Sequence, residues 1–376
     1  MKVGLLTLPF NNNYGGYLQA YALMTILKSL NCDVELINRR PNRMPLVSFC
    51  KKVVKNCIKL CIGRKQPFII PNQERDYMIK GMNMLPFVRK HIQPISSALF
   101  SSRAMNKYIK GRFDLIVVGS DQVWRPEYVP NIEDFFLCGV DSCVNKVAYA
   151  ASFGCFDPVY SKKERAICGN AIKKFKAVGL REKSGSVVMK KMGWNCECKH
   201  VLDPTMLLSK ADYESLFSKE RSFDKNELFV YILDDNESIE RLVDEICDKS
   251  GLKKNYIIDP ELWKKTNYLM PSVEKWLRGI DDSKMVITDS FHGVVFSIIF
   301  NKPFWVVANE NRGSDRFESL LSLLHLEKRM ITTKSNLATI WNDDINWENV
   351  NQIIDENKDE CRLFIAQNVK CGDIKF

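Results

Sequence analysis

Residues 286–300 read VITDSFHGVVFSIIF, and the fold that we expect is built around this stretch. Residues 286–288 are apolar or β-branched, as in a buried strand. Asp289 and Ser290 then supply turn and helix-cap side chains, and Gly293 opens a short apolar helix. A strand that turns into a helix at a glycine leaves backbone N–H groups and the positive end of the helix dipole facing one point. The stretch therefore predicts a place where an anion can bind.

His292 lies within this turn, where its imidazole can reach whatever the N–H groups hold. Ligands of open α/β sheets bind at the carboxyl ends of the strands, which favours a functional histidine. A second interpretation makes this an ordinary buried turn, with Asp289 as the helix cap and His292 as a hydrogen-bonded structural residue. The residues of the turn alone leave both interpretations open.

The composition is that of a globular protein with room for two domains. The chain has 376 residues, 45% of them hydrophobic and 27% charged, and a net charge of +10. An excess of Lys and Arg favours anionic partners such as phosphorylated substrates or an acidic membrane surface. No nucleic-acid-binding signature and no basic run interleaved with aromatic residues is present, so we expect no nucleic-acid partner.

The cysteines and the amino terminus indicate a reducing compartment. There are 13 Cys residues, an odd number, without the spacing of a disulfide framework. The start, MKVGLLTLPF, is typical of a strand and lacks the anatomy of a signal peptide. We therefore expect a cytoplasmic protein. Cys196, Cys198 and His200 match no common zinc pattern, so we expect no metal site.

The first ninety residues begin with half of a βαβ unit. Residues 3–8 predict a strand, residues 17–30 a helix, and residues 33–38 the next strand. Asn13 and the pair Gly15–Gly16 precede the helix and are candidates for lining a ligand crevice; the glycines could equally serve turn geometry alone.

Residues 43–66 form a basic insertion. Within it, residues 46–62 predict an amphipathic helix without any acidic residue, in which Lys51, Lys52, Lys55 and Lys59 share one face. Such a helix fits either a contact with the inner face of an anionic membrane or ordinary packing on the core.

A second strand end carries polar residues beside a flat aromatic side chain. Residues 115–118 read LIVV, a continuous apolar strand of the parallel-sheet kind. Asp121, Gln122 and Trp124 follow it, and an aspartate in this company can bind and deprotonate a sugar hydroxyl. The alternative is that Asp121 only caps the next helix.

A third strand end favours anions. Residues 146–153 and 177–180 predict two strands, with a basic helix at 162–176 between them. The second strand delivers Arg181 and Lys183, followed by Ser184 and Gly185, to the start of a helix. Arginine suits the bidentate binding of carboxylate or phosphate. The segment that follows, KHVLDP at 199–204, predicts a short strand and a proline stop.

A second α/β series begins near residue 228. It predicts strands at 229–233, 255–258, 286–288 and 303–308, with helices between them and one at 317–326 that Arg316 precedes. Two consecutive series predict an α/β protein of two Rossmann-like domains, residues 1–208 and 209–345, that face a ligand cleft. Residues 346–376 predict a terminal helix that folds back on the first domain.

Seven stretches, in order, resemble the polysaccharide pyruvyl transferase family. Each is weak alone, but together they cover nearly the whole chain except residues 43–103. They are NYGGYLQAYAL (13–23), DLIVVGSDQVW (114–124), YAASFG (149–154), LREKSG (180–185), VLDPTMLL (201–208), TDSFHGVVFSIIF (288–300) and RFESLLSLL (316–324).

The resemblance implies a glycosyltransferase-B-like fold and the transfer of the pyruvyl group of phosphoenolpyruvate to a sugar of a surface polysaccharide precursor. The product is a cyclic ketal, and no cofactor is expected. Phosphoenolpyruvate would contact Arg181, Lys183, Ser290, His292, Gly293 and Arg316, in one anion pocket on the second-domain side of the cleft. The acceptor, which polyprenyl diphosphate could carry, would contact Asn13, Gly15, Gly16, Asp121, Gln122 and Trp124. His292 and Asp121 are the expected catalytic residues.

Two other functions remain open. One is a glycosyltransferase that uses a nucleotide sugar in the same architecture. Such an enzyme needs an aromatic or acidic clamp for the nucleoside in the second domain, and the sequence shows none clearly. The other is a non-catalytic membrane-surface component of polysaccharide assembly, which would give the turns at Arg181, Asp121 and His292 no reason to converge.

Overall fold

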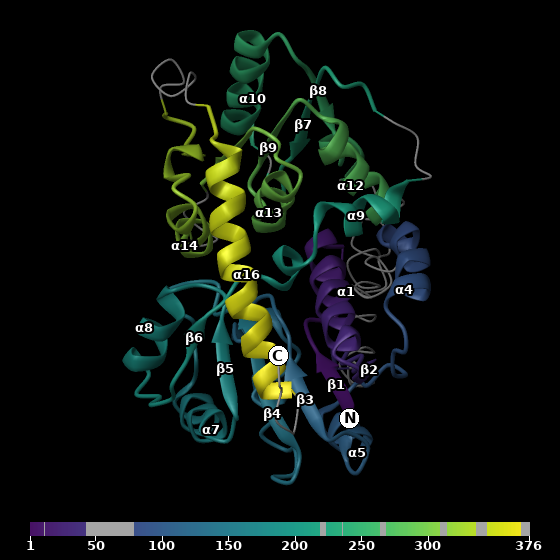
Figure 1. Ribbon diagram of the computed structural model, residues 1–376, viewed down its shortest axis with the longest axis vertical. Coiled ribbons are helices and arrows are strands. Elements are labelled where there is room, and N and C mark those ends of the chain that lie inside the picture. Colours follow the sequence, from purple (N-terminus) through teal and green to yellow (C-terminus); the bar gives the residue numbers. More distant parts are fainter. Residues whose placement is uncertain are drawn as a thin grey trace, which may run out of the picture.

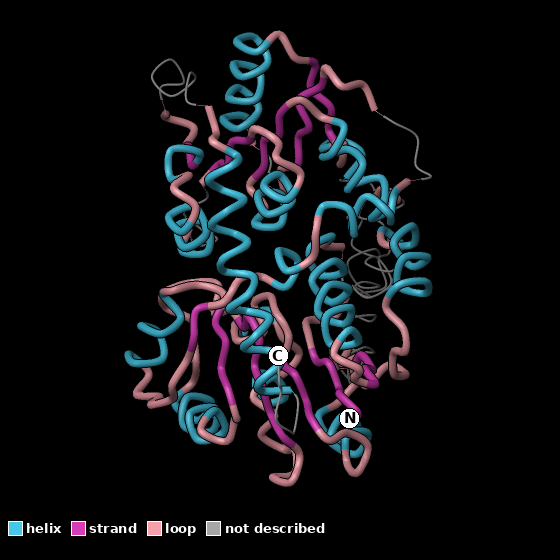
Figure 2. Tube along the Cα trace, in the orientation of Figure 1, coloured by secondary structure: helices cyan, strands magenta, loops and turns pink. Residues whose placement is uncertain are grey.

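The computed structural model describes residues 1–10, 12–42, 79–218, 223–234, 236–263, 268–308, 314–335 and 344–369. Within them the chain forms two parallel β-sheets with helices around each, as the two groups of strands in Figures 1 and 2 show. The sequence predicted two Rossmann-like units, and this prediction is confirmed. The basic helix expected at residues 46–62, with its membrane contact, lies outside the described residues and stays a prediction.

The first sheet has the strand order β2-β1-β3-β4-β5-β6. The order changes direction between β1 and β3, and open α/β sheets bind ligands at such a switch point. Its strands are β1 (Lys2–Leu6), β2 (Asp33–Leu36), β3 (Leu115–Val118), β4 (Asn145–Ala151), β5 (Ala177–Leu180) and β6 (Lys199–His200). The helical elements that accompany it are α1 (Tyr14–Ser29), η1 (Met82–Met84), α4 (Leu85–His91), α5 (Ser102–Ile109), η2 (Pro126–Tyr128), α6 (Ile132–Phe135), α7 (Lys162–Ile172) and α8 (Ser184–Lys191).

The second sheet has the order β11-β10-β9-β7-β8 and reverses between β7 and β9. Its strands are β7 (Glu227–Tyr231), β8 (Lys253–Tyr256), β9 (Met285–Thr288), β10 (Phe304–Val307) and β11 (Met330–Ile331). The remaining helical elements are η3 (Pro204–Leu207), α9 (Lys210–Phe217), α10 (Glu237–Ser250), α11 (Pro260–Trp263), α12 (Val273–Asp282), α13 (Phe291–Ile299), α14 (Asp315–Leu323), η4 (Glu327–Arg329) and α16 (Trp347–Val369).

The central strands are apolar along their whole length because helices cover both faces of each sheet. All four residues of β3 are buried, and so are the last three of β9. Helix α13 is apolar almost all round, and every residue from its start through Ile298 is buried. A helix of this kind belongs inside the protein. The strand-to-helix turn predicted at residues 286–300 is confirmed.

Helix α1 begins three residues earlier than the sequence predicted. The Asn13 side chain caps it by accepting a hydrogen bond from the Gly15 backbone N–H at 3.1 Å. Gly15 and Gly16 therefore lie in the first helical turn, and neither has a positive φ. A cap at Asn13 satisfies an N–H group that would otherwise have no partner. The glycines thus belong to the helix and do not form the turn before it.

The two sheets share one apolar core. A single cluster of buried side chains includes Val3 and Leu5 of β1 together with Val286 of β9. Across the boundary, Tyr14 of α1 stacks on Trp276 of α12 with 5.1 Å between ring centroids. The Tyr14 hydroxyl also donates to the Pro271 carbonyl at 2.9 Å. These contacts fix α1 of the first unit against the second unit.

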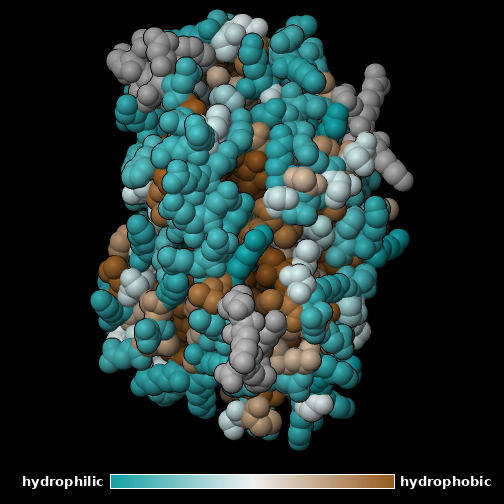
Figure 3. Space-filling model, in the orientation of Figure 1, coloured by the Kyte–Doolittle hydropathy of each residue, from teal (hydrophilic) through white to brown (hydrophobic). Residues whose placement is uncertain are grey.

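Helix α16 runs beside both sheets (Figure 1) and packs on η3 and β4. Its Arg362 donates to the Leu207 carbonyl at 2.8 Å, and its Phe364 contacts Tyr149 of β4. Hydrophilic residues cover most of the face seen in Figure 3, with hydrophobic ones gathered beside this helix. None of the described helices combines the length and the apolar content needed to cross a bilayer.

Candidate active site between the two sheets

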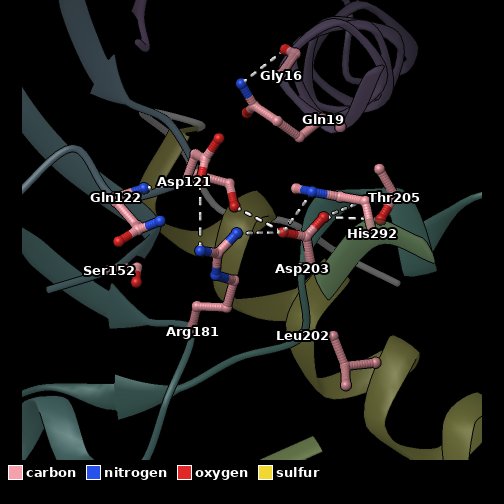
Figure 4. Close-up of polar contacts among 12 residues, drawn as sticks. Gly16, Gln19, Asp121, Gln122, Ser152, Arg181, Leu202, Asp203, Thr205 and His292 are labelled. Atoms are coloured by element: carbon pink, nitrogen blue, oxygen red, sulfur yellow. Dashed lines mark hydrogen bonds and ion pairs between the residues drawn. The ribbon is translucent and has the colours of Figure 1, made fainter. Parts of the chain in front are cut away.

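The site is centred on Asp203, a buried carboxylate that follows β6. One of its oxygens, Oδ2, accepts hydrogen bonds from Arg181 at 3.1 Å and from the Ser120 hydroxyl at 2.8 Å, and lies 3.6 Å from Nε2 of His292. The other, Oδ1, accepts from the backbone and hydroxyl of Thr205. Figure 4 shows Arg181 and His292 approaching this carboxylate from different elements.

These side chains come from both sheets. Arg181 follows β5 and Ser120 follows β3, so both stand at the carboxyl edge of the first sheet. His292 belongs to α13, which follows β9 of the second sheet. We expected Arg181 and His292 to share a pocket on the side of the second domain. That location is corrected, because β5 lies in the first sheet and the cluster joins the two sheets.

Burial and charge together fix the ionisation of Asp203 and Arg181. Burial alone would raise the pKa of the Asp203 carboxyl, but His292 and Arg181 hold this pKa well below its ordinary value. Burial would likewise lower the pKa of Arg181, yet Asp121 and Asp203 raise it. The net effect keeps the carboxylate and the guanidinium charged inside the protein.

Gly15 allows the His292 imidazole to lie directly against α1. A Cβ atom added at Gly15 would stand 1.9 Å from Nδ1 of His292, whereas one added at Gly16 would meet no atom within 4 Å. Only a residue without a side chain permits this approach. The imidazole is therefore held between the α1 backbone on one side and Asp203 on the other.

Two buried guanidinium groups lie near one aromatic ring. The Cζ atoms of Arg181 and Arg316 are 4.6 Å and 5.9 Å from the centroid of Phe291, the first residue of α13. The Nε atom of each is buried without a hydrogen-bond partner among the described residues. Burial, and next the charge of Arg181, lowers the pKa of Arg316 to about 10. Two such cations beside a helix N-terminus form a place that favours an anion.

The turn before α13 is held by its own side chains. The Ser290 backbone N–H donates to the Thr288 hydroxyl at 3.0 Å, and the Ser290 side chain makes no capping bond. A Cβ atom at Gly293 would lie 2.4 Å from Oγ1 of Thr288, so the glycine lets the helix pack closely on β9. The first N–H groups of the helix have no partner within the helix and can serve a ligand.

Asp289 does not cap the helix. Its two carboxylate oxygens accept the backbone N–H groups of Leu233 and Asp234, at 2.8 and 2.9 Å. This contact joins the carboxyl ends of β7 and β9, the two strands between which the strand order reverses. The interpretation of Asp289 as the helix cap is corrected, because the carboxylate is used on the neighbouring strand end.

Asp121 has a strained backbone. Its φ is +79°, in the left-handed region that a non-glycine residue rarely adopts. Its Oδ1 accepts from the Gln122 backbone N–H at 2.9 Å and contacts Arg181 at 3.4 Å, while Gln122 itself accepts from Arg125. The next helical element is η2, whose N-cap is Arg125, so Asp121 does not cap it. Strain of this kind gathers at functional sites.

Three predicted ligand residues lie outside the buried cluster or are already engaged. Trp124 is fully buried, donates its indole N–H to the Phe135 carbonyl at 3.1 Å and stacks on Phe136. Its assignment to the acceptor is wrong, because the ring belongs to the core. The Lys183 side chain is exposed, outside the buried cluster, and its backbone N–H donates to Ser319 of α14. Asn13 is the cap of α1, so its side chain oxygen is already engaged.

Sequence reasoning missed several members of the site. Asp203 lies in the stretch KHVLDP, for which the sequence predicted only a short strand that ends at a proline. Its position directly after the apolar pair Val201–Leu202 could have identified it as a polar residue at a strand end. Glu182 accepts the N–H groups of Phe153 and Gly154 through Oε1, and its Oε2 is buried without a partner among the described residues. The Gln19 side-chain amide, on α1, donates a hydrogen bond to the Thr7 hydroxyl, and no local sequence pattern predicts this contact.

A pocket of about 320 Å³ lies at the carboxyl ends of β7 and β8. Pockets of this size hold small ligands. The aromatic and acidic groups that the sequence did not clearly show in the second domain are present here. The pocket is lined by Asn12, Ile232, Leu233, Asp234, Tyr256, Ile258, Pro260 and Trp263.

The sequence model of the family described as polysaccharide pyruvyl transferase matches residues 13–311. The chain belongs to this family. The matched region spans the Asp203 cluster, Asp121 and the turn at His292, whereas Arg316 lies just beyond it. No curated protein matches the chain.

Solved structures share the fold at low sequence identity. UDP-GlcNAc 2-epimerase from Neisseria meningitidis, bound to UDP-GlcNAc, has a TM-score of 0.50 at 10% identity, covering 98% of this chain and 99% of that one. UGT71G1 from Medicago truncatula, complexed with UDP-glucose, has a TM-score of 0.49 at 10% identity, with 98% and 97% covered. The two parallel sheets together with the match to the Neisseria epimerase give the chain a GT-B-like fold. Among the described residues, no three His, Cys, Asp or Glu side chains gather as metal ligands would.

Replacing Gly15 by alanine should displace His292. The new methyl group would overlap the imidazole, and overpacking of this kind costs about 1–3 kcal/mol of stability. Gly16→Ala is the matched control, since its methyl group meets open space and removes a helix glycine, a gain of up to about 1 kcal/mol. The urea concentration at the midpoint of unfolding should therefore fall for Gly15→Ala and rise for Gly16→Ala, relative to wild type. Histidine NMR signals should shift only in Gly15→Ala; unchanged signals there would contradict the packing.

Replacing Asp203 by asparagine should destabilise the fold by about 3–5 kcal/mol at pH 7, because it leaves buried Arg181 without one of its carboxylates. The folded pKa of Asp203 lies below the unfolded value of about 3.9, so its stabilisation is present above that pH and is lost as the pH falls below it. The gap between wild type and variant should narrow below about pH 4. Asp248→Asn on the exposed face of α10 is the control, and equal unfolding curves for wild type and Asp203→Asn would contradict the assignment.

Proposed function

We propose that the protein transfers the pyruvyl group of phosphoenolpyruvate to two hydroxyls of one sugar in a polysaccharide precursor. The observation that carries the proposal is the pair of buried guanidinium groups of Arg181 and Arg316 at the N-terminus of α13, beside His292. Phosphoenolpyruvate has a phosphate and a carboxylate close together, and this arrangement offers donors to both. No cofactor or metal is part of the proposal.

The donor would be held by groups with unused hydrogen-bonding capacity. The phosphate would take the first N–H groups of α13, including that of Gly293, together with Arg316. The carboxylate would take Nε of Arg181, since the terminal nitrogens of this guanidinium already hold Asp203 and Asp121. Bound in this way, the substrate would also separate the like charges of the two arginines. Ser290 lies at the same helix start, and exposed Lys183 would act from the rim.

His292 would act as the general acid. It gives a proton to the methylene carbon, so the C=C double bond opens and the neighbouring carbon becomes electrophilic. Asp203, 3.6 Å from Nε2 of His292, stabilises the protonated imidazole before transfer and holds the ring in place. On its opposite side the ring packs against the α1 backbone at Gly15, which fixes its position. The proton lost from His292 is replaced by one taken from the acceptor.

Asp121 would act as the base for the acceptor. Both contacts of its carboxylate use Oδ1, and we assign Oδ2 to the attacking hydroxyl. The hydroxyl oxygen bonds to the electrophilic carbon, phosphate leaves with its bridging oxygen, and the second hydroxyl closes the ring. Of the two hydroxyl protons, one balances the proton added to the methylene and the other leaves with phosphate. Gln122, Gly15 and Gly16 would also contact the acceptor.

The acceptor would be a glycan precursor, and a polyprenyl diphosphate carrier would bring the enzyme to the inner face of the membrane. The basic stretch 46–62 is the part of the sequence that supports such a contact, through its lysines.

A second candidate function is glycosyl transfer from a nucleotide sugar. The observation that favours it is the pocket at β7 and β8, because Trp263, Tyr256 and Asp234 could receive a nucleoside. In this function the buried arginines and His292 would bind the diphosphate of the nucleotide sugar. It predicts binding of UDP or a related nucleotide in place of phosphoenolpyruvate.

The proposal predicts phosphate release from phosphoenolpyruvate in the presence of a sugar acceptor, with separable effects of three variants. Arg316→Gln should weaken phosphoenolpyruvate binding about tenfold or more, because a charged hydrogen bond to the anion is lost. His292→Gln and Asp121→Asn should bind it within a few-fold of wild type and release phosphate about a hundredfold more slowly or worse. Calorimetry measures binding, and a coupled phosphate assay measures turnover.

Arg241→Gln removes an exposed arginine of α10 and is the matched control, for which both quantities should stay unchanged. Failure of the wild type to bind phosphoenolpyruvate at millimolar concentration would overturn the proposal. If UDP bound instead and Arg316→Gln weakened the binding of UDP, the nucleotide-sugar function would replace pyruvyl transfer.

A further inference from the structure

The pocket at the carboxyl ends of β7 and β8 has two kinds of lining. Most of its surface is apolar or aromatic, with Tyr256 and Trp263 as the large rings. The described lining also includes an amide and a carboxylate side chain, Asn12 from the first unit and Asp234 from the second. A mainly apolar pocket with a few placed polar groups is typical of a site for a small organic ligand.

Asn12 has unused hydrogen-bonding capacity. Both atoms of its amide, Nδ2 and Oδ1, are buried and have no hydrogen-bond partner among the described residues. Buried polar side chains in folded proteins are almost always hydrogen-bonded, so this amide gains its missing partners if the side chain turns toward a ligand in the pocket beside it. The amide offers one acceptor and two donors, as a ligand with neighbouring hydroxyl groups requires.

Both rims of the pocket lead to His292. On one rim, Asn12 stands three residues before Gly15, which touches the imidazole; three residues of chain span at most about 11 Å. On the other rim, the backbone of Leu233 and Asp234 is held by Asp289, three residues before His292. These spacings are within the reach of a molecule of two linked rings, with one ring in the pocket and the next toward His292.

We propose that this pocket binds the sugar ring next to the one that receives the pyruvyl group. Tyr256 and Trp263 would contact the C–H face of the ring, while Asn12 and Asp234 would bind its hydroxyls. This inference rests on the proposed function, because it takes the acceptor to be a glycan. It makes the enzyme specific for a disaccharide unit, in which the second ring supplies binding and the first ring the reacting hydroxyls.

The charges of the lining favour a neutral sugar over a nucleotide. Among the described residues, its lining includes the acidic Asp234 and no Lys or Arg. A diphosphate attached to a ligand in the pocket would meet a carboxylate at the rim, which disfavours it. An uncharged polyol meets no such penalty.

The test is saturation-transfer NMR with a panel of methyl glycosides: the common hexoses, the N-acetylhexosamines and their disaccharides, and, separately, UDP. The variants are Asn12→Ala, which removes the amide, and Ile258→Trp, which fills the pocket. Asn170→Ala on the exposed surface of α7 is the matched control. At least one disaccharide should bind to wild type and to the control, about tenfold more weakly to Asn12→Ala, and not measurably to Ile258→Trp.

Three results would overturn the inference: binding of no glycoside in the panel, disaccharide binding that both pocket variants leave unchanged, or binding of UDP that Ile258→Trp abolishes. Calorimetry of phosphoenolpyruvate with the same variants keeps the two proposals apart. Unchanged donor binding with no effect on sugars would refute the pocket alone, whereas absent donor binding in wild type would refute the proposed function.

Discussion

The site depends on one buried carboxylate that contacts an arginine and a histidine from two different sheets. Asp203 contacts Arg181 from the end of β5 and His292 from the start of α13, and neither sheet alone could supply both. Buried charges are unfavourable unless they are paired, so the geometry of this cluster is tied to the packing of the two units. The shared apolar core around α1 provides that packing, with Tyr14 stacked on Trp276 at its centre.

The same arrangement explains why some residues are glycines and why some acids are not helix caps. Gly15 has no side chain because the His292 imidazole occupies that space, and Gly293 has none because α13 lies on Thr288. Asp289 does not cap α13, because its carboxylate accepts a backbone N–H group from the segment that follows β7. The strand ends are thus hydrogen-bonded to one another. The side chains that would bind a ligand stand on segments whose backbone is already fixed by these contacts. Pre-organised donors of this kind need little rearrangement when charge develops in a reaction.

Local chemistry made much of the fold predictable. Continuous apolar runs such as LIVV indicated parallel strands, and the polar residues after them indicated the binding edge, which correctly located Arg181, Asp121 and His292 at strand ends. The role of Trp124 could not be predicted, because an aromatic residue beside polar ones has the same sequence pattern whether it binds a sugar or fills the core; its burial is a tertiary property. The contact between Gly15 and His292 joins residues far apart in sequence, and no periodicity contains it. Asp203 was hidden for the same reason, since its partners come from three other segments.

The central claim is that Asp203 and His292 act as one unit in proton transfer. A double-mutant cycle on phosphate release from phosphoenolpyruvate tests it most directly, using Asp203→Asn, His292→Gln and the double variant under conditions where all are folded. If Asp203 acts through the imidazole, the double variant should be no slower than His292→Gln alone. If instead the two losses multiply, the residues act independently and the account is contradicted.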